Sequence, residues 1–314
     1  MKNILELKNV STTFDSRDGL VKAVCGVNLE IAPGEIVGLV GETGCGKSVL
    51  GQTILRLTPP SARTEGSIVF EGKDLITMDE KALMEIRGRK IAYINQNPAE
   101  SLDPVMKVGD QIVESIRLYE GISKKEAADK AKKILKSLSF EDPESIFSKY
   151  PIELSGGMKQ RIMVAMVMCG QPPFMIADEP TKGLDALVRG QVINSLKKFI
   201  AYAQCGGLII THDLKFARAI CERIAIMYAG EIVEIAPKDE VFFKTLHPYL
   251  EGLVASMPQN GMKVIQGNPC SLIDLPTGCR FHDRCAYCSS KCVHLHPAMK
   301  KISFNHEVRC FKYD

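Results

Sequence analysis

The segment GETGCGKS at residues 41–48 has the spacing of a phosphate-binding loop, G-x-x-x-x-G-K-[ST]. It lies between an apolar run at 35–40 and a stretch with helical spacing, which is the context that such a loop requires. Its glycines allow backbone N–H groups to turn towards phosphate oxygens, assisted by the positive end of the helix. We expect Lys47 to reach the β and γ phosphates and Ser48 to ligate Mg²⁺. The predicted nucleotide-binding residues are Gly41, Glu42, Thr43, Gly44, Cys45, Gly46, Lys47, Ser48 and Val49.

A second apolar run, FMIADE at residues 174–179, ends in two carboxylates. Asp178 is placed to hold the water shell of the metal ion, and Glu179 to polarise the water that attacks the γ-phosphate. Acidic residues at the end of a strand are usually only solvated. In a chain that also has a phosphate-binding loop, however, they indicate hydrolysis of the bound nucleotide, with Glu179 and Lys47 as catalytic residues.

The segment LSGGM at 154–158 offers a second phosphate-binding turn. Ser155, followed by Gly156 and Gly157, caps the start of a helical stretch, and the amides of such a start can bind phosphate. One chain has one phosphate-binding loop, so both features cannot easily surround one nucleotide within a monomer. We expect a two-fold arrangement in which the LSGG turn of each subunit closes the phosphate-binding loop of the other.

A mostly parallel α/β sheet must position these residues. Residues 4–10 and 20–31 alternate between apolar and polar side chains, as half-buried strands do. The runs at 35–40 and 174–178 are apolar throughout, which is typical of strands buried on both faces, and a third such run begins near 207. Helical stretches separate these runs, and the alternation predicts an α/β core.

The β pattern disappears between residues 97 and 170. There, Ser123 and Glu126 form a capping box that opens a helical segment over 123–138, which indicates a helical insertion. After about residue 237, prolines recur until the cysteines begin. We predict three parts: an ATPase core over 1–96 and 171–240, a helical subdomain over 97–170, and a linker with a small Cys-rich C-terminal module over 241–314.

The composition excludes several classes of protein. The 314 residues are 45% hydrophobic and 25% charged, as in globular proteins of about two domains. Forty Lys and Arg against 37 Asp and Glu leave a charge of +3, too small to favour nucleic acid as a partner. No apolar run reaches the length of a membrane span, and the N-terminus lacks the pattern of a signal peptide. We therefore expect a cytosolic chain.

The order of these motifs over residues 1–240 resembles the nucleotide-binding subunit of an ATP-binding cassette (ABC) transporter. The resemblance implies binding of ATP and Mg²⁺, and it assigns further roles. Gln96, in YINQN, matches the glutamine that senses Mg²⁺ and couples to the membrane partner, and His212, in IITHD, matches the histidine that contacts the γ-phosphate. Phe14 lies where the family has an aromatic ring that stacks on adenine, and Asp185 matches the aspartate that communicates across the dimer.

Two segments depart from the family pattern. Met158 stands where glutamine is usual, which should cost little because the backbone and Ser155 bind the phosphate. The segment TKGLD places Lys182 and Gly183 where an Ala-Leu-Asp form is common. Because of this departure, one alternative is a module that binds ATP without hydrolysing it.

A branch of the family is indicated by ESLDPVMKVGDQI, by LSGGMKQRIMVAM, and by HPY at 247–249 with a cysteine-bearing tail. These segments resemble the ATPases of bacterial dipeptide, oligopeptide and nickel importers. The resemblance implies a homologous or identical ATPase partner, two permeases, an extracytoplasmic binding protein, and a peripheral position on the cytoplasmic side of the membrane. The expected function is to power the uptake of short peptides. A nickel importer ATPase and a non-transport ABC ATPase are the alternatives.

Six of the eleven cysteines lie after residue 269. Four of them stand where this branch commonly has cysteines, and Cys270 and Cys288 look additional. Four thiolates can hold either zinc or a four-iron, four-sulfur cluster, and the uneven spacing favours the cluster. Zinc, with a histidine as a possible ligand, and unliganded thiols or a disulfide are the alternatives. The expected cluster ligands are Cys279, Cys285, Cys292 and Cys310; the possible histidine ligands are His282, His294 and His296; and the arginines expected to offset the cluster's charge are Arg280, Arg284 and Arg309.

Overall fold

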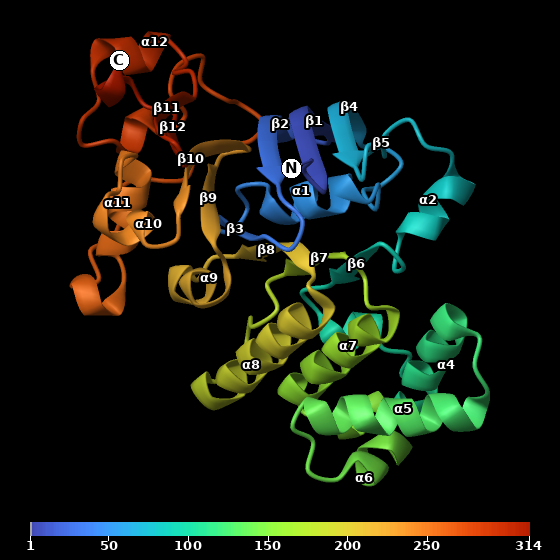
Figure 1. Cartoon of the computed structure of the whole chain (residues 1–314). Coiled ribbons are helices and arrows are strands. Elements are labelled where there is room, and N and C mark those ends of the chain that lie inside the picture. Colours follow the sequence, from blue (N-terminus) through green and yellow to red (C-terminus); the bar gives the residue numbers. More distant parts are fainter. Residues whose placement is uncertain (1) are drawn as a thin grey trace. The chain divides into compact units, whose positions relative to one another are not determined.

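The computed structural model describes residues 2–314, and the chain divides into two compact units. Unit 1 contains the chain up to Ala32, Ile36–Thr77 and Leu208–Asp314, and unit 2 contains Pro33–Glu35 and Met78–Gly207. In Figure 1 the blue, orange and red segments belong to unit 1 and the green segments to unit 2. The predicted three-part division follows other boundaries and stays a prediction.

The first sheet of unit 1 is antiparallel, with the strand order β2-β1-β4-β5. Its strands are β1 (Leu5–Ser16), β2 (Gly19–Ile31), β4 (Arg63–Phe70) and β5 (Lys73–Asp74). Strand β1 runs beyond the predicted 4–10, because register shifts after Leu7 and Val10 interrupt the alternation on which the prediction rests. Helix α1 (Lys47–Ile54) contacts β1 and β2, and this sheet therefore supports the helix that follows the phosphate-binding loop.

The second sheet of unit 1 has the strand order β11-β12-β10-β9-β3-β8. Its strands are β3 (Ile36–Val40), β8 (Gly206–Thr211), β9 (Arg223–Tyr228), β10 (Glu231–Pro237), β11 (Lys300–Ser303) and β12 (His306–Val308). Strand β3 pairs parallel with β9, and every residue of β3 is buried, as its apolar sequence predicts. Helix α9 (Leu214–Ile220) covers β3.

The C-terminal region adds strands to this sheet. Strand β12 pairs antiparallel with β10, with Glu234 opposite Val308, and β11 continues the order. The other elements of this region are α10 (Glu240–Phe243), α11 (Pro248–Ala255), α12 (Ser290–His294) and short 3-10 helices at Pro258–Asn260, His282–Arg284 and Phe311–Tyr313. The residues after 241 are thus built partly into the core sheet.

A buried ion pair joins β12 to β10. His306 Nε2 lies 2.7 Å from Glu234 Oε1, and His306 Nδ1 lies 2.9 Å from Glu240 Oε2. Glu234 is fully buried and also accepts hydrogen bonds from the backbone N–H groups of Leu246 and His247. Burial lowers the pKa of His306, but the hydrogen bonds to the two carboxylates outweigh it and raise the pKa above its usual value.

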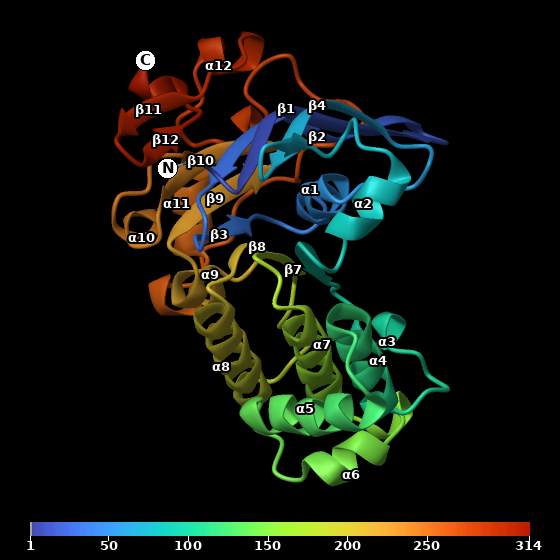
Figure 2. The ribbon, with the colours of Figure 1, turned by 45° about the vertical axis from the view of Figure 1, so that its right-hand side comes forward.

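Unit 2 has two parallel strands, β6 (Ile91–Ile94) and β7 (Phe174–Asp178), and many helices. These are α2 (Glu80–Ile86), α3 (Pro98–Ser101), α4 (Val108–Glu120), α5 (Lys124–Ser137), α6 (Pro143–Ser148), a 3-10 helix at Pro151–Glu153, α7 (Gly156–Gly170) and α8 (Ala186–Ala203). The predicted capping box is present, since Ser123 Oγ accepts from the N–H of Glu126 and the Glu126 carboxylate accepts from the N–H of Ser123. Helices α4, α5 and α7 pack on one another, as Figure 2 shows.

Candidate nucleotide-binding site

The phosphate-binding loop joins β3 to α1 in unit 1, and two of its glycines are required by close contacts. A Cβ atom on Gly41 would lie 2.2 Å from the carbonyl oxygen of Met227. Gly46 has φ +106°, and a Cβ atom there would lie 2.0 Å from the carbonyl oxygen of Ala23. Any side chain at these positions would displace the backbone of β2 or β9. The tight turn of the loop therefore depends on the absence of side chains.

Lys47 is buried in the loop that precedes it. Its Nζ donates hydrogen bonds to the carbonyl oxygens of Gly41 and Glu42, each at 2.8 Å. Helix α1 begins at Lys47 without a side-chain cap, so its first N–H groups can bind an anion. Ser48, in the first turn, is half-buried, whereas Thr43 and Gly44 are exposed. The loop therefore presents an ammonium group and a helix start, the features that bind phosphate.

Two more predicted residues lie in unit 1. His212 follows β8 directly and is exposed. The next residue, Asp213, accepts hydrogen bonds from the N–H groups of Lys215 and Phe216 and so caps α9, which fixes the turn that carries His212. Phe14 is half-buried in β1, opposite Val21 of β2.

The acidic strand end lies in unit 2. Asp178 is the last residue of β7 and is 2% exposed, and the hydroxyl of Tyr93 donates a hydrogen bond of 3.0 Å to its Oδ2. Burial, together with the charge of Asp178, raises the pKa of Tyr93, which keeps its hydroxyl protonated as a donor. Glu179 is 7% exposed and has φ +47°, a backbone conformation that is unusual for any residue except glycine. Sequence reasoning missed Tyr93, although a tyrosine in the strand before the Gln96 motif was a visible signal.

Gln96 follows β6, the strand that pairs parallel with β7. Ile94 is opposite Ala177 in that pair, so Gln96 and Asp178 both lie at the carboxyl ends of neighbouring strands. Gln96 is half-buried, and its N–H donates to Asn95 Oδ1 at 2.8 Å. Within unit 2, the structure thus brings the predicted Gln96 and Asp178 to the same edge.

The LSGG turn begins α7. Ser155 Oγ accepts a hydrogen bond from the N–H of Met158 at 3.3 Å, so Ser155 is the N-cap that the sequence predicts. Ser155 and Gly156 are exposed. Gly157 is buried, and a Cβ atom on it would lie 2.0 Å from Val188 Cγ1 in α8. Gly157 therefore allows α7 to pack closely against α8, whereas the exposed Ser155 and Gly156 can contact a ligand.

The segment TKGLD, which ends at Asp185, leads into a helix cap. Asp185 Oδ1 accepts hydrogen bonds from the N–H groups of Leu187 and Val188, at 3.0 and 2.9 Å, and begins α8. Lys182 and Gly183 are exposed, and Gly183 has φ +72°. The glycine that departs from the family pattern therefore occupies a conformation that favours glycine.

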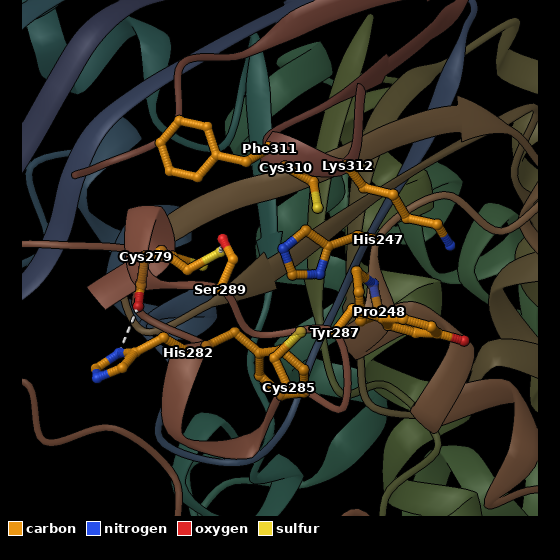
Figure 3. A pocket seen from close by; sticks show the side chains of 12 residues that line it. His247, Pro248, Cys279, His282, Cys285, Tyr287, Ser289, Cys310, Phe311 and Lys312 are labelled. Carbon is orange, nitrogen blue, oxygen red and sulfur yellow. Dashed lines mark hydrogen bonds between the residues drawn. The ribbon is translucent and has the colours of Figure 1, made fainter. Parts of the chain in front are cut away.

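The predicted cysteine ligands line one cavity of about 230 Å³ in the C-terminal region, together with His247, Phe281 and Phe311. Figure 3 shows this cavity and the hydrogen bond of 2.8 Å between His282 Nδ1 and the carbonyl oxygen of Cys279. Burial raises the pKa of the Cys279 thiol to about 12. Within residues 2–314, however, no three His, Cys, Asp or Glu side chains form a group that could hold a metal ion. The described residues therefore form no site for a single metal ion, and the expected iron–sulfur module is not shown.

The three arginines beside these cysteines have other partners than the predicted cluster. Arg280 Nε and Arg309 Nε lie 3.7 and 3.6 Å from the buried carboxylate of Glu231, and Arg284 pairs with Glu42. A buried guanidinium group is most stable beside a carboxylate, and the nucleotide-binding core supplies two, Glu231 and Glu42, to the three arginines. The prediction that these arginines offset a cluster's charge overlooked those carboxylates.

Two family models match the sequence: the ABC transporter model over residues 24–182 and the oligopeptide/dipeptide transporter C-terminal region over residues 233–292. The first spans half of the chain and includes the phosphate-binding loop and the acidic strand end. The chain therefore belongs to the ABC transporter family and is an ATPase of the ABC type. Within that family it has the C-terminal region of the oligopeptide and dipeptide transporters.

Known relatives agree with this assignment. The oligopeptide transport ATP-binding protein OppD of Bacillus subtilis (strain 168) is 39% identical over 98% of this chain and 88% of its own length. The dipeptide transport ATP-binding protein DppD of the same strain is 37% identical over 100% and 96%. A dimeric post-hydrolysis structure of the ATP-binding cassette MJ0796, bound to ADP and Pi, is 30% identical, with a TM-score of 0.67 over 74% of this chain and 98% of that chain. The predicted α/β fold with a phosphate-binding loop is confirmed.

None of the helices found in residues 2–314 combines the length and the apolar character that crossing a membrane requires.

Proposed function

We propose that this chain is the ATP-hydrolysing subunit that powers the uptake of short peptides through an ABC importer. The observation that carries the proposal is the combination of a formed phosphate-binding loop with the C-terminal region of the oligopeptide and dipeptide transporters in one chain. Relatives named for oligopeptide and dipeptide transport match over nearly its whole length. Its position would be peripheral, on the cytoplasmic side of the membrane, beside two permeases fed by an extracytoplasmic binding protein.

The residues of unit 1 bind the nucleotide in this proposal. Lys47 and the first N–H groups of α1 hold the phosphates, and Phe14 stacks on adenine. His212 contacts the γ-phosphate from the turn fixed by Asp213. The exposed Thr43 and Gly44 leave the loop open to the incoming triphosphate.

Hydrolysis in this proposal depends on Glu179 and Lys47 as catalytic residues. Glu179 orients the water that attacks the γ-phosphate in line, and the leaving ADP accepts the charge that develops. Ser48, Gln96 and Asp178 would hold Mg²⁺, which neutralises charge on the phosphates when bound. Oxygen ligands such as these fit that ion. The hydroxyl of Tyr93 orients the Asp178 carboxylate for this task.

A second ATPase subunit completes the site, either a copy of this chain or a paralogue. Its Ser155–Gly157 turn would approach the γ-phosphate bound by Lys47. The exposure of Ser155 and Gly156 and the dimeric state of the solved relative support this arrangement. Asp185 would communicate between the subunits. The domain division into core, helical subdomain and C-terminal module belongs to the same proposal.

The transport proposal is tested in proteoliposomes that contain this chain with its permeases and binding protein. Labelled dipeptides, labelled oligopeptides and Ni²⁺ are offered separately, and the Lys47→Ala variant serves as the inactive control. We expect ATP-dependent accumulation of peptide that is lost with Lys47→Ala. Accumulation of Ni²⁺ alone would favour a nickel importer, and ATPase activity indifferent to the permeases would favour a non-transport ATPase.

We also propose that the four-cysteine cavity holds a four-iron, four-sulfur cluster. A single zinc ion requires all its thiolate ligands about 2.3 Å from one point. A four-iron, four-sulfur cluster instead binds each cysteine at a different iron atom, which suits cysteines that are spread around a cavity. The support is that Cys279, Cys285, Cys292 and Cys310 all line the same cavity. Anaerobically purified protein should contain iron and acid-labile sulfide and absorb near 400 nm. Stoichiometric zinc, or no metal, would refute the cluster.

A further inference from the structure

Glu42, in the phosphate-binding loop, is held by the C-terminal region of the chain. Its two carboxylate oxygens accept hydrogen bonds from Arg284: Nη1 lies 2.8 Å from Oε2 and Nη2 lies 3.0 Å from Oε1. This bidentate geometry is the strongest form of an arginine–carboxylate pair. The side chain of Arg284 is 4% exposed and that of Glu42 is 25% exposed, so solvent screens the pair only weakly.

The backbone of Glu42 is held as well. Its N–H donates a hydrogen bond of 2.8 Å to the hydroxyl of Tyr249, and its carbonyl oxygen accepts from Lys47 Nζ. Tyr249 is fully buried, and its ring centroid lies 4.7 Å from that of Tyr228 and 5.4 Å from that of Phe281. Packing of these rings therefore fixes the hydroxyl that orients the first peptide units of the loop.

Arg284 is fixed by its own surroundings. Its Nε donates to the carbonyl oxygen of Gln266 at 3.1 Å, and its Nη1 also contacts the hydroxyl of Tyr228 at 3.4 Å. The guanidinium group lies over the rings of Tyr228 and Phe281, at 5.8 and 5.7 Å. The next residue, Cys285, lines the four-cysteine cavity. A short, ordered path of contacts thus leads from that cavity to the phosphate-binding loop.

A phosphate-binding loop binds its ligand tightly when its N–H groups already have the bound arrangement. The free energy of binding is then not reduced by the cost of ordering them. Glu42 follows Gly41 at the start of the loop, where a rotated peptide unit would redirect the residues after it. We propose that Arg284 and Tyr249 are positioning residues that act through Glu42 and make nucleotide affinity depend on the C-terminal region. This inference rests on the proposed function of the loop as the ATP site.

The alternative is that these contacts only anchor the C-terminal region. Loss of an anchor would lower the stability of the protein and the fraction that is active, but the active molecules would bind nucleotide as before. Loss of a positioning contact weakens binding in the ground state and the transition state alike, which raises KM and leaves kcat nearly unchanged. Affinity and the split between KM and kcat therefore distinguish the two roles.

The experiment uses the full chain with the substitutions Arg284→Met and Tyr249→Phe, the second of which removes a single hydroxyl group and keeps the ring. Arg218→Met is the control for loss of an arginine–carboxylate pair in the same unit, because Arg218 pairs with Asp239 at 3.0 Å, with side chains 41% and 64% exposed. Affinity for Mg²⁺–ADP is measured by equilibrium titration, which requires no turnover, and KM and kcat for ATP are measured in parallel. Thermal unfolding is recorded for every variant.

We expect affinity for Mg²⁺–ADP to fall about tenfold in both variants, which corresponds to about 1.4 kcal/mol. KM for ATP should rise by a similar factor, with kcat per active molecule nearly unchanged and Arg218→Met like wild type. Unchanged affinity in Tyr249→Phe and Arg284→Met, with only a lower unfolding temperature, would overturn the inference. Failure of the wild-type chain to bind nucleotide would instead count against the proposed function.

A double-mutant cycle makes the test more specific to Glu42. Glu42→Gln keeps the shape of the side chain and removes its charge. If Arg284 acts through Glu42, the double variant Glu42→Gln with Arg284→Met should bind Mg²⁺–ADP no more weakly than Arg284→Met alone. Arg284→Lys keeps the charge but cannot form the bidentate pair, so it should restore affinity only in part. Additive losses in the double variant would show that Arg284 acts by another route.

Discussion

Replacing Tyr93 by phenylalanine tests whether the buried Asp178 carboxylate needs its tyrosine partner. The substitution removes one hydroxyl group, keeps the ring, and leaves Asp178 with one hydrogen bond fewer. Asp178 is only 2% exposed, and the bond measures 3.0 Å with an ionised acceptor. Hydrogen bonds to charged groups are worth about 1.5–3 kcal/mol, so we expect the free energy of unfolding to fall by about 2 kcal/mol.

The assay is urea-induced unfolding of the nucleotide-free protein, followed by circular dichroism and tyrosine fluorescence. Tyr202→Phe is the matched control, because Tyr202 is 68% exposed and the same chemical change there should have little effect. The raised pKa of Tyr93 keeps its hydroxyl protonated, so the loss should be the same at pH 7 and pH 9. If Tyr93→Phe costs no more than Tyr202→Phe, the reasoning about Asp178 is wrong.

Three further predictions concern turnover, packing and pH. Glu179→Gln should leave ATP binding intact and lower kcat by about 10²–10⁴-fold, because an amide cannot act as the base that orients water. Gly157→Ala should destabilise the protein by about 1–3 kcal/mol, because its Cβ atom would lie 2.0 Å from Val188 Cγ1, and Val188→Ala in the same chain should restore most of the loss. His306→Gln should lower stability by about 2 kcal/mol near pH 6, where His306 is charged beside Glu234, and by less at pH 9.

The sign of the pH effect follows from the raised pKa of His306. A histidine whose pKa is higher in the folded state stabilises the fold fully below the unfolded value, and this contribution is lost as pH rises through the folded value. Thermal unfolding between pH 6 and pH 9 should therefore show a flatter slope for His306→Gln than for wild type. An equal loss at both pH values would contradict the charged pair.

Glu141→Gln, at an exposed position, is the control for Glu179→Gln, and full hydrolysis by Glu179→Gln would remove Glu179 from the catalytic role.

Most of the nucleotide-binding loop could be predicted from the sequence, because residues that are near one another in the chain form it. The glycines at 41 and 46 occupy positions where a Cβ atom would collide with backbone, and Ser155 and Ser123 cap the helices that the sequence predicts. The apolar runs at β3 and β7 were correctly predicted to be buried strands, because a strand that is buried on both faces has apolar residues throughout. These features depend on residues that are neighbours in the sequence, and a pattern can therefore reveal them.

Contacts between distant segments could not be reached in this way. Tyr93 meets Asp178 across two parallel strands, and Arg284 meets Glu42 across most of the chain. No spacing rule indicates which carboxylate a given arginine will contact, so the sequence did not predict the pairs of Arg280 and Arg309 with Glu231 or of Arg284 with Glu42. The length of β1 was underestimated because its register shifts break the alternation of side chains.

The pairing of β12 with β10 has a consequence for how the protein is made. The edge of β10 that pairs with β12 stays unpaired until the ribosome has synthesised and released β12, about 70 residues later in the chain. An unpaired strand edge can form hydrogen bonds with another chain. The outermost strand, β11, begins with Lys300 and Lys301, whose charges discourage such pairing once the sheet is closed. A nascent chain stalled before His306 should therefore aggregate or require a chaperone, whereas the finished protein protects its own edge.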